Sequence, residues 1–325
     1  MKKLLVVCGP TSTGKTTLAV KLAREFNGEL VSADSRQVYR RVDIGTGKDL
    51  PIGSKIKHPW FSRYGFYEVS GVKVWGYDLV DPKSEFSVGQ YLKFARYMIA
   101  DIQKRKKLPI LVGGTGLYIK GVTDGIPTAS IPKNSNLRKN LETKNASELY
   151  ELLASLDALK AGSMNSSDRK NPRRLVRAIE VSQYLVDHKV SFNKQPEDTM
   201  DILFIGLTAD KSFIDKKIDT RVKKRIDEGI KTEIEKLLKS GVSWDSQSML
   251  SLGYRQWRDY FEGGVPEQNI IDEWGREEKK YARRQFVWFK KDKRINWFDV
   301  TAKNYPKVVE KRVKKWYSSG NVQED

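Results

Sequence analysis

Short apolar runs alternate with helix-like segments over the first third of the chain. Residues 4–8 and 108–112 are apolar and predict buried strands, and residues 29–32 predict a third strand. Residues 17–26 and 87–104 repeat apolar side chains at three- to four-residue spacing, which is typical of amphipathic helices. Strands that alternate with helices predict an α/β fold around an open parallel sheet.

The pattern changes after the last of these strands. A stretch rich in turn residues follows, and residues 136–186 predict several helices without strands. The strand-like run at 201–207 then returns to the earlier pattern. We therefore expect residues 1–122 and 200–325 to form the α/β core with basic carboxyl-terminal helices, and residues 123–199 to form an all-helical insertion domain.

A glycine loop joins the first strand to the first helix. Residues 9–16 match G-x-x-x-x-G-K-[ST], and the flanking strand and helix are the context that this motif requires. The glycines let backbone N–H groups turn toward an anion, and the helix amino terminus adds partial positive charge. Lys15 supplies a cation, and the Thr16 hydroxyl can bind magnesium. The loop predicts polyphosphate binding, but leaves open whether a phosphoryl group is transferred or diphosphate is the leaving group.

Polar side chains follow the other two strands. Asp34 and Ser35 come directly after residues 29–32, and Thr115 follows residues 108–112 after two glycines. Ligands of an open parallel sheet bind beyond the carboxyl ends of its strands, so we expect these side chains to face the phosphate loop. A carboxylate there can take a proton from a nucleophile that approaches the bound phosphate. The alternative is that Asp34 only caps the next turn.

The charge balance favours a nucleic-acid partner. Sixty Lys and Arg residues against 41 Asp and Glu give a net charge of +19, which is typical of a protein that binds a phosphate backbone. Residues 276–294 hold nine basic and three acidic side chains, with Tyr281, Gln285 and Trp288 on one helical stripe. Basic and aromatic side chains at helical spacing suit nucleic acid, although the aromatic ones can equally belong to the core.

The remaining composition excludes several classes of protein. With two histidines and the single Cys8, the chain has no set of zinc ligands and no partner for a disulfide. No apolar run is long enough to span a bilayer, and the first strand is too short for a signal peptide. A cytoplasmic protein without a membrane partner is therefore expected.

Six blocks in order resemble the tRNA dimethylallyltransferases, also called isopentenyl-tRNA transferases. The blocks are residues 9–16, 32–40 with 43–46, 112–118, 173–180, 252–256 and 281–289. The resemblance implies a P-loop nucleotide-kinase-like core with an all-helical insertion. The metal-binding finger of eukaryotic members is absent, which indicates a bacterial-type enzyme. Residues 74–82 depart from the family, because they lack the paired histidines that it usually carries there.

The resemblance also implies a reaction. The family transfers a dimethylallyl group from its diphosphate to N6 of adenosine 37 in tRNA, after the base has left its stack. Asp34 would take the N6 proton, Thr115 would orient the site, and Mg2+ would bind as the cofactor beside Thr16. Lys15 and Arg221 would neutralise the diphosphate as the C–O bond breaks. The diphosphate-binding set is Gly9, Pro10, Thr11, Ser12, Thr13, Gly14, Lys15, Thr16 and Arg221.

A third group of residues is assigned to tRNA by the same resemblance. Ser35, Arg36 and Gln37 would read bases next to the target, with Asp34 and Thr115 on the target itself. In the insertion the set is Arg138, Arg173, Arg174, Leu175, Val176 and Arg177. In the core it is Leu250, Ser251, Leu252, Gly253, Tyr254, Arg255, Arg283, Arg284, Gln285, Phe286, Val287, Trp288, Phe289 and Lys290. The anticodon stem-loop and dimethylallyl diphosphate are thus the expected partners of a monomeric enzyme.

Three other functions stay open on the sequence alone. A prenyltransferase acting on free AMP or ADP would share the diphosphate chemistry, but a free nucleotide needs neither basic segment. A small-molecule kinase would use the same loop for ATP, although the Asp34 and Thr115 blocks argue against it. A non-enzymatic RNA-binding module would have no use for a phosphate loop with Asp34 opposite.

Overall fold

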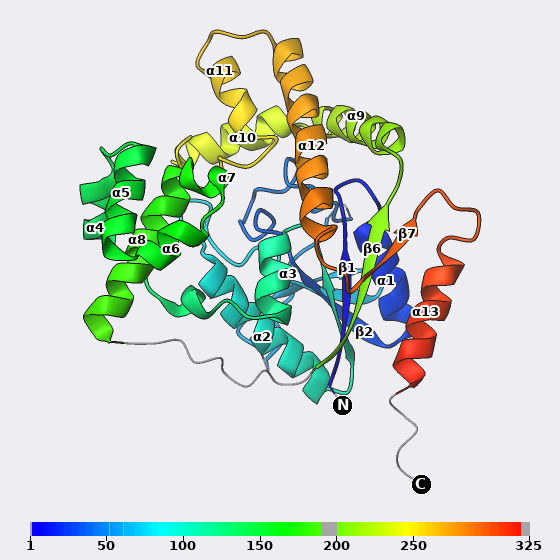
Figure 1. Ribbon diagram of the computed structural model, residues 1–325. Coiled ribbons are helices and arrows are strands. Elements are labelled where there is room, and N and C mark those ends of the chain that lie inside the picture. Colours follow the sequence, from blue (N-terminus) through cyan, green and yellow to red (C-terminus); the bar gives the residue numbers. More distant parts are fainter. Residues whose placement is uncertain (1, 52, 61, 190–199, 320–325) are drawn as a thin grey trace. The chain divides into compact units, whose positions relative to one another are not determined.

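The computed structural model describes residues 2–51, 53–60, 62–189 and 200–319 (Figure 1). The chain forms two compact units, one of Met1–Asp124 with Asp198–Asp325 and one of Gly125–Glu197. The last ten residues assigned to the insertion, 190–199, lie outside the described residues. Every described helix is too short or too polar to traverse a lipid bilayer.

The first unit is built on a seven-stranded sheet in the order β3-β4-β2-β5-β1-β6-β7. Neighbouring strands are parallel except β3 and β4, which form an antiparallel hairpin at one edge. The expected α/β fold with a mostly parallel sheet is therefore confirmed. The strands are β1 (Lys3–Cys8), β2 (Gly28–Ser32), β3 (Phe66–Val69), β4 (Val72–Trp75), β5 (Leu108–Val112), β6 (Asp201–Thr208) and β7 (Ile295–Asp299).

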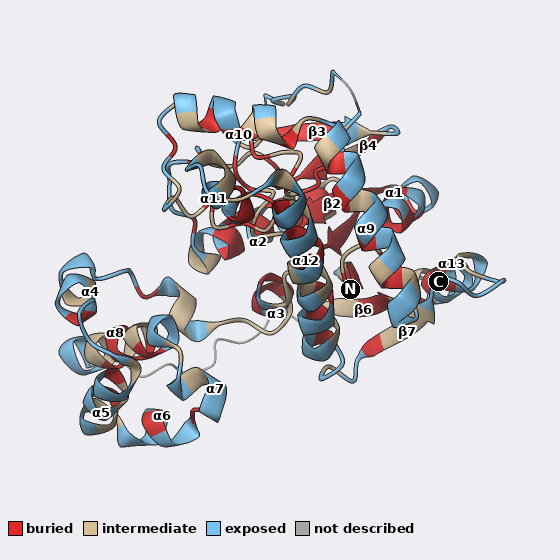
Figure 2. Ribbon diagram, turned by 90° about the horizontal axis from the view of Figure 1, so that it is seen from above, coloured by how far each residue is buried: buried red, intermediate tan, exposed pale blue. Residues whose placement is uncertain are grey.

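Helices cover both faces of this sheet (Figure 1; Figure 2). Helices α1 and α13 pack on the face that carries Leu5 and Val7, while α2 and α3 lie on the other side. Strands covered on both faces are buried throughout, which explains their continuous apolar runs. The helices of this unit are α1 (Lys15–Glu25), α2 (Val88–Lys104), α3 (Gly116–Thr123), α9 (Lys211–Asp227), α10 (Ile230–Lys239), the 3-10 turn η2 (Arg255–Trp257), α11 (Arg258–Phe261), α12 (Glu267–Phe289) and α13 (Lys307–Ser318).

The structure differs from the sequence-based prediction at the edge of the sheet and after β6. The prolines and glycines of residues 50–72 predict a loop, but Phe66–Val69 is a strand because it pairs with β4 and buries Phe66. After Asp210, isoleucine and valine recur every four residues as far as Ile230 and predict one long helix. The structure has two helices instead, since Gly229 adopts a left-handed φ of 90° between α9 and α10. Pairing with β4 decided the first case, and the backbone conformation of Gly229 decided the second.

The second unit is helical in its described part. Its elements are η1 (Pro127–Ser130), α4 (Ser135–Leu141), α5 (Ala146–Leu156), α6 (Ala158–Ser163), α7 (Ser166–Arg169) and α8 (Pro172–His188). An Asn-Pro pair is typical of a helix start, and here Asn171 caps α8 by accepting from Arg174 N–H while Pro172 occupies the first helical position. Leu149, Leu153 and Leu175 form the centre of a small apolar core.

Candidate active site

The carboxyl ends of β1, β5 and β2 open onto a cavity of about 800 Å³ in the first unit. These three strands are parallel neighbours, so the loops that follow them meet at one edge of the sheet. Eight basic and three acidic side chains line the cavity. They are Lys15, Arg36, Lys217, Arg221, Lys224, Arg225, Arg255 and Arg284 against Asp34, Asp49 and Glu278. This excess of positive charge favours an anionic ligand.

The phosphate loop between β1 and α1 depends on its two glycines. Gly14 has a φ of 77°, and a Cβ at Gly9 would lie 2.3 Å from the carbonyl oxygen of Leu207. Gly14 is the amino-terminal cap of α1 and provides no side-chain hydrogen bond. The first N–H groups of the helix are therefore available for an anion.

Lys15 has a strongly desolvated ammonium group. Its Nζ donates to Pro10 O at 2.6 Å. Burial, followed by repulsion from Arg221, lowers the pKa of Lys15 to about 8, although the charge of Asp34 acts in the opposite direction. A bound diphosphate would stabilise the charged form that burial destabilises.

Diphosphate binding is expected to lose the contribution of Lys15 as the pH rises through about 8, the pKa of this group. Below that pH the ammonium is charged in the empty site, and above it binding must also take up a proton. Titration calorimetry with inorganic pyrophosphate at several pH values, on wild type and Lys15→Arg, measures the effect. Arginine stays charged throughout, so the variant should lack this inflection. Identical pH profiles for the two proteins would contradict the assignment.

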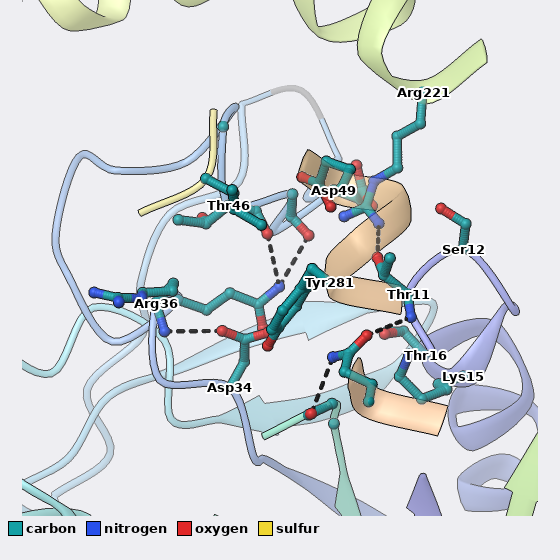
Figure 3. A pocket seen from close by; sticks show the side chains of 18 of the residues that line it. Thr11, Ser12, Lys15, Thr16, Asp34, Arg36, Thr46, Asp49, Arg221 and Tyr281 are labelled. Atoms are coloured by element: carbon teal, nitrogen blue, oxygen red, sulfur yellow. Dashed lines mark hydrogen bonds between the residues drawn. The ribbon is translucent and has the colours of Figure 1, made fainter. Parts of the chain in front are cut away.

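Arg221 of α9 lies over the phosphate loop (Figure 3), and its Nη1 donates to Thr11 Oγ1 at 2.6 Å. Gly47 permits this approach, because a Cβ there would lie 2.1 Å from Arg221 Nη2. Two buried groups at this wall, the Ser12 hydroxyl and Arg221 Nε, have no hydrogen-bond partner among the described residues. Such groups are expected where a bound anion completes the network.

Magnesium fits this site only together with a bound phosphate. The exposed Thr16 lines the cavity. The described residues contain no cluster of three or more His, Cys, Asp or Glu side chains that could hold a metal ion. Mg2+ normally keeps several waters and is bound by few protein oxygens plus substrate phosphates. A hydroxyl beside a phosphate loop meets that requirement, and the magnesium site stays a prediction.

Asp34 lies in the same cavity as Lys15, beside the ring of Tyr281 (Figure 3). Its Oδ1 accepts from Arg36 N–H at 2.8 Å, so the carboxylate does close the local turn. The same residue also lines the cavity. The two interpretations from the sequence are therefore compatible, because one oxygen can serve the turn while the carboxylate faces the ligand.

The neighbouring Arg36 and Gln37 also line the cavity, but both have protein partners. Arg36 Nη1 donates to Gln247 O at 2.8 Å. Gln37 Nε2 donates to Gly47 O at 2.9 Å, and Ser32 Oγ donates to Gln37 Oε1 at 3.1 Å. Reading of bases by these side chains stays a prediction, and it requires exchange or sharing of these hydrogen bonds.

Thr115 supports the turn that carries Asp34. Its Oγ1 accepts from Ser35 N–H at 3.0 Å, and its own N–H donates to Ala33 O at 3.1 Å. Gly113 makes the close approach possible, because a Cβ there would lie 2.2 Å from Ala33 O. The structure thus brings Thr115 next to the Asp34 turn, while the cavity wall itself is formed by the adjacent glycines.

Tyr281 is a cavity residue that sequence reasoning left out of the site. Burial, followed by the charge of Asp34, raises the pKa of its phenol, which is therefore neutral at physiological pH. The sequence placed Tyr281 on the stripe of α12 with Gln285. This helical stripe was the available signal in the sequence, but spacing alone does not show whether it faces the cavity.

The ion pairs and hydrogen bonds that anchor the loop at residues 43–48 are a second feature that the sequence did not reveal. The buried Lys48 donates to Tyr39 O and forms ion pairs with Asp43 and Asp78. From the other side, Glu233 of α10 accepts from the N–H groups of Asp43 and Ile44. Burial raises the pKa of Glu233. These partners hold the glycine loop against Arg221.

The residues assigned to tRNA differ in exposure. The exposed ones are Arg173, Arg174, Arg255, Arg283, Arg284, Val287, Trp288 and Lys290. Those of intermediate exposure are Asp34, Ser35, Arg36, Gln37, Thr115, Arg138, Val176, Arg177, Leu250, Leu252 and Phe286. The buried ones are Leu175, Ser251, Gly253, Tyr254, Gln285 and Phe289. The buried side chains do not reach the surface in this conformation, so a direct contact with RNA is expected only from the others.

Two arginines of the second unit have a clear structural partner. Arg138 and Arg177 both pair with the buried carboxylate of Glu180, at 2.9 and 2.5 Å. Hydrogen bonds from the two arginines and from Asn134 N–H lower the pKa of Glu180 to about 2, against the effect of burial. Their predicted contact with tRNA is untested, and Arg173 is the exposed arginine of this helix without such an ion pair among the described contacts.

Comparison with known proteins decides the family. A family model described as IPP transferase matches residues 37–292, and one described as isopentenyl transferase matches residues 2–58. The chain belongs to the IPP transferase family. The two matches together take in the phosphate loop, the Asp34 turn, Arg221 and the whole of α12.

Individual members of the IPP transferase family agree with this membership. The tRNA dimethylallyltransferase of Carboxydothermus hydrogenoformans is 35% identical, with 95% of this chain and 96% of that protein covered. The solved tRNA isopentenylpyrophosphate transferase of Bacillus halodurans is 30% identical with a TM-score of 0.69, covering 99% and 98%. A eukaryotic dimethylallyltransferase acting on tRNA shares the fold at 23% identity and a TM-score of 0.77, covering 98% and 80%. The resemblance found in the sequence and the enzyme class, a prenyltransferase, are confirmed.

Proposed function

We propose that this enzyme transfers a dimethylallyl group from dimethylallyl diphosphate to N6 of adenosine 37 in tRNA, beside the anticodon, and releases diphosphate. The observation that carries the proposal is one cavity with two kinds of wall, a phosphate loop with Lys15 and Arg221 and a carboxylate at Asp34. Membership of the IPP transferase family and the tRNA-acting relatives support the choice of donor and acceptor.

The donor side of the cavity would act on the leaving group. As the allylic C–O bond breaks, negative charge grows on the bridging oxygen of the diphosphate, and Lys15, Arg221 and the amides of the phosphate loop stabilise it. Bound Mg2+ would supply further neutralisation of the phosphates, with Thr16 as its protein ligand. No phosphoryl group is transferred, so the enzyme needs no nucleophile at phosphorus.

The acceptor side would act on the adenine amine. This amine is a weak nucleophile because its lone pair is delocalised into the ring. Asp34 accepts a hydrogen bond from N6 and takes its proton as the new N–C bond forms. Electrons balance, because the pair of the broken C–O bond leaves with diphosphate and the amine supplies the pair of the N–C bond.

The target base must leave the anticodon stack to enter this cavity. Unstacking costs a few kcal/mol, which contacts in the pocket offset. A single-stranded loop is the part of an RNA where this cost is lowest and where base edges are accessible. The basic lining of the cavity and the exposed Arg283 and Arg284 suit such a substrate.

Mass spectrometry tests the proposal directly. The protein is incubated with Mg2+, dimethylallyl diphosphate and an unmodified tRNA with adenosines at positions 36, 37 and 38, and AMP is offered in a parallel reaction. We expect one C5H8 unit on adenosine 37 alone. Modified AMP with unmodified tRNA would replace the proposal by prenylation of a free nucleotide. No product in either reaction would contradict it.

Replacing Arg283 and Arg284 by alanine is expected to weaken tRNA binding and to flatten its salt dependence. Both side chains are exposed on α12, and each phosphate contact that is lost removes about one unit from the slope of log K against log salt. Filter binding at several salt concentrations measures this slope. Lys223→Ala, an exposed lysine of α9 outside the cavity lining, is the control for loss of charge alone. An unchanged slope in the double variant would exclude phosphate contacts by these arginines.

A further inference from the structure

One side chain of α12 joins the two loops that form the donor and acceptor walls. Gln285 is 94% buried, since its exposed fraction is 6%. Its Oε1 accepts from the N–H of Thr11 in the phosphate loop at 2.8 Å. Its Nε2 donates to Gly114 O, in the loop after β5, at 2.9 Å. A dashed line at Thr11 in Figure 3 marks the first of these hydrogen bonds.

The loop after β5 is shaped to receive this helix. A Cβ at Gly114 would lie 2.1 Å from Gln285 Nε2, and its three nearest atoms all belong to Gln285. A Cβ at Gly116 would likewise lie 2.1 Å from the indole of Trp288. Gln285 and Trp288 are one helical turn apart, so α12 contacts both glycines that flank Thr115.

We propose that Gln285 is a positioning residue that sets the distance between the bound diphosphate and the acceptor side of the cavity. This inference builds on the proposed function and deepens it. The resemblance had assigned Gln285 to tRNA. Its burial and its two hydrogen bonds instead make it a bridge between the donor loop and the acceptor loop.

Both polar atoms of the Gln285 side-chain amide are bonded within the protein. The Thr11 N–H belongs to the phosphate loop, and it is already bonded to Gln285, so the diphosphate is bound by the remaining amides. The same amide group is tied to Gly114, the neighbour of Thr115, which in turn holds the Asp34 turn through Ser35. Loss of the bridge lets the two walls shift relative to each other. A displacement near 1 Å at reacting atoms lowers the rate by about 100-fold.

A double-mutant cycle between Gln285 and Gly114 tests the bridge. The variants are Gln285→Ala, Gly114→Ala and the double variant, and the control is Gln268→Ala, an exposed glutamine of α12 whose amide donates to Asp272 at 2.9 Å. We expect kcat to fall by about 10- to 100-fold in each single variant, because each removes or displaces the same amide. The double variant should be no worse than the worse single one, since the added methyl then meets no side chain.

Two further readouts separate positioning from other roles. The KM for tRNA should change less than about 3-fold, as expected when an interaction acts on the chemical step. Inorganic pyrophosphate binds without any reaction, and calorimetry measures its affinity. This affinity should fall in each single variant, and the double variant should again be no worse than the worse single one. The control should match wild type in both measurements. Thermal unfolding of each variant establishes that the folded protein is compared.

The possible results have distinct meanings. A higher KM for tRNA at unchanged kcat would mean that Gln285 acts in RNA binding, and it would overturn the proposal. Additive losses, or an unchanged kcat, would also overturn it, because the two positions would then act independently or not at all. If the variants showed the expected non-additive loss of pyrophosphate affinity but wild type did not prenylate tRNA, the proposed function would fall while the role of Gln285 would stand.

Discussion

Asp34→Asn is expected to lower kcat for prenyl transfer by about 10²- to 10⁴-fold, the usual contribution of a general base. Asparagine has nearly the same shape, and its side-chain oxygen can still accept from Arg36 N–H as Asp34 Oδ1 does at 2.8 Å. The turn is therefore kept while the basic oxygen is lost. The affinity for tRNA should stay within about 3-fold of wild type. The substitution changes one side chain in a large interface, and most single side chains of such an interface contribute little to affinity.

Single-turnover kinetics with saturating tRNA measures this loss apart from binding. Asp81→Asn is a matched control, because Asp81 is exposed and its Oδ1 also accepts from the N–H two residues later, in Lys83, at 2.9 Å. A defect shared by both variants would mean that closing a local turn is the whole role of Asp34. An equal loss of tRNA binding and of rate would also contradict the assignment as base.

Arg221→Ala is expected to lower kcat by about 10²- to 10³-fold, as removal of one preorganised donor to a developing charge does in other enzymes. Arg221 reaches the loop through Thr11, and its buried Nε has no partner among the described residues. Its charge matters most when the C–O bond is nearly broken, so kcat should fall more than donor affinity.

Steady-state kinetics with varied dimethylallyl diphosphate separates these two effects. Lys223→Ala on the same helix removes one charge outside the cavity lining and serves as the control. Guanidinium ions added to Arg221→Ala should restore part of the rate, because the truncated side chain leaves room beside Gly47. A higher KM for the donor at unchanged kcat would show that Arg221 binds the ground state and the transition state equally well.

The pair Arg221 and Arg225 illustrates the limit of a helical pattern. The two arginines are four residues apart on one face of α9, so the spacing alone allows either to close over the phosphates or both to pair with nearby acids, and only the resemblance favours Arg221. In the structure Arg225 is 3% exposed and pairs with Glu278 of α12 at 3.1 Å. Arg221 instead reaches Thr11. The difference comes from α12, which lies beside α9 and carries Glu278, 53 positions after Arg225 in the chain.

The sheet shows a similar limit. Strands β1 and β5 are almost entirely apolar and are buried on both faces, so their composition identifies them as strands. Strand β3 has only four residues, of which Phe66 and Tyr67 are buried, and its hydrogen bonds come from β4. Short edge strands carry too little periodicity to outweigh neighbouring glycines, and pairing with another segment decides them.

The sequence by itself determined the phosphate loop, the polar residues that follow β2 and β5, the basic charge and the family. These features are local or additive, because a strand, a loop and a helix in direct succession define an anion site without reference to the rest of the chain. Tertiary structure alone decided which stripe of α12 faces the cavity, and that Gln285 meets Thr11 across 274 positions. Tertiary structure alone likewise decided the roles of Lys48 and Glu233. Their roles arise from burial beside partners distant in the chain, and no spacing within a single helix or strand encodes such partners.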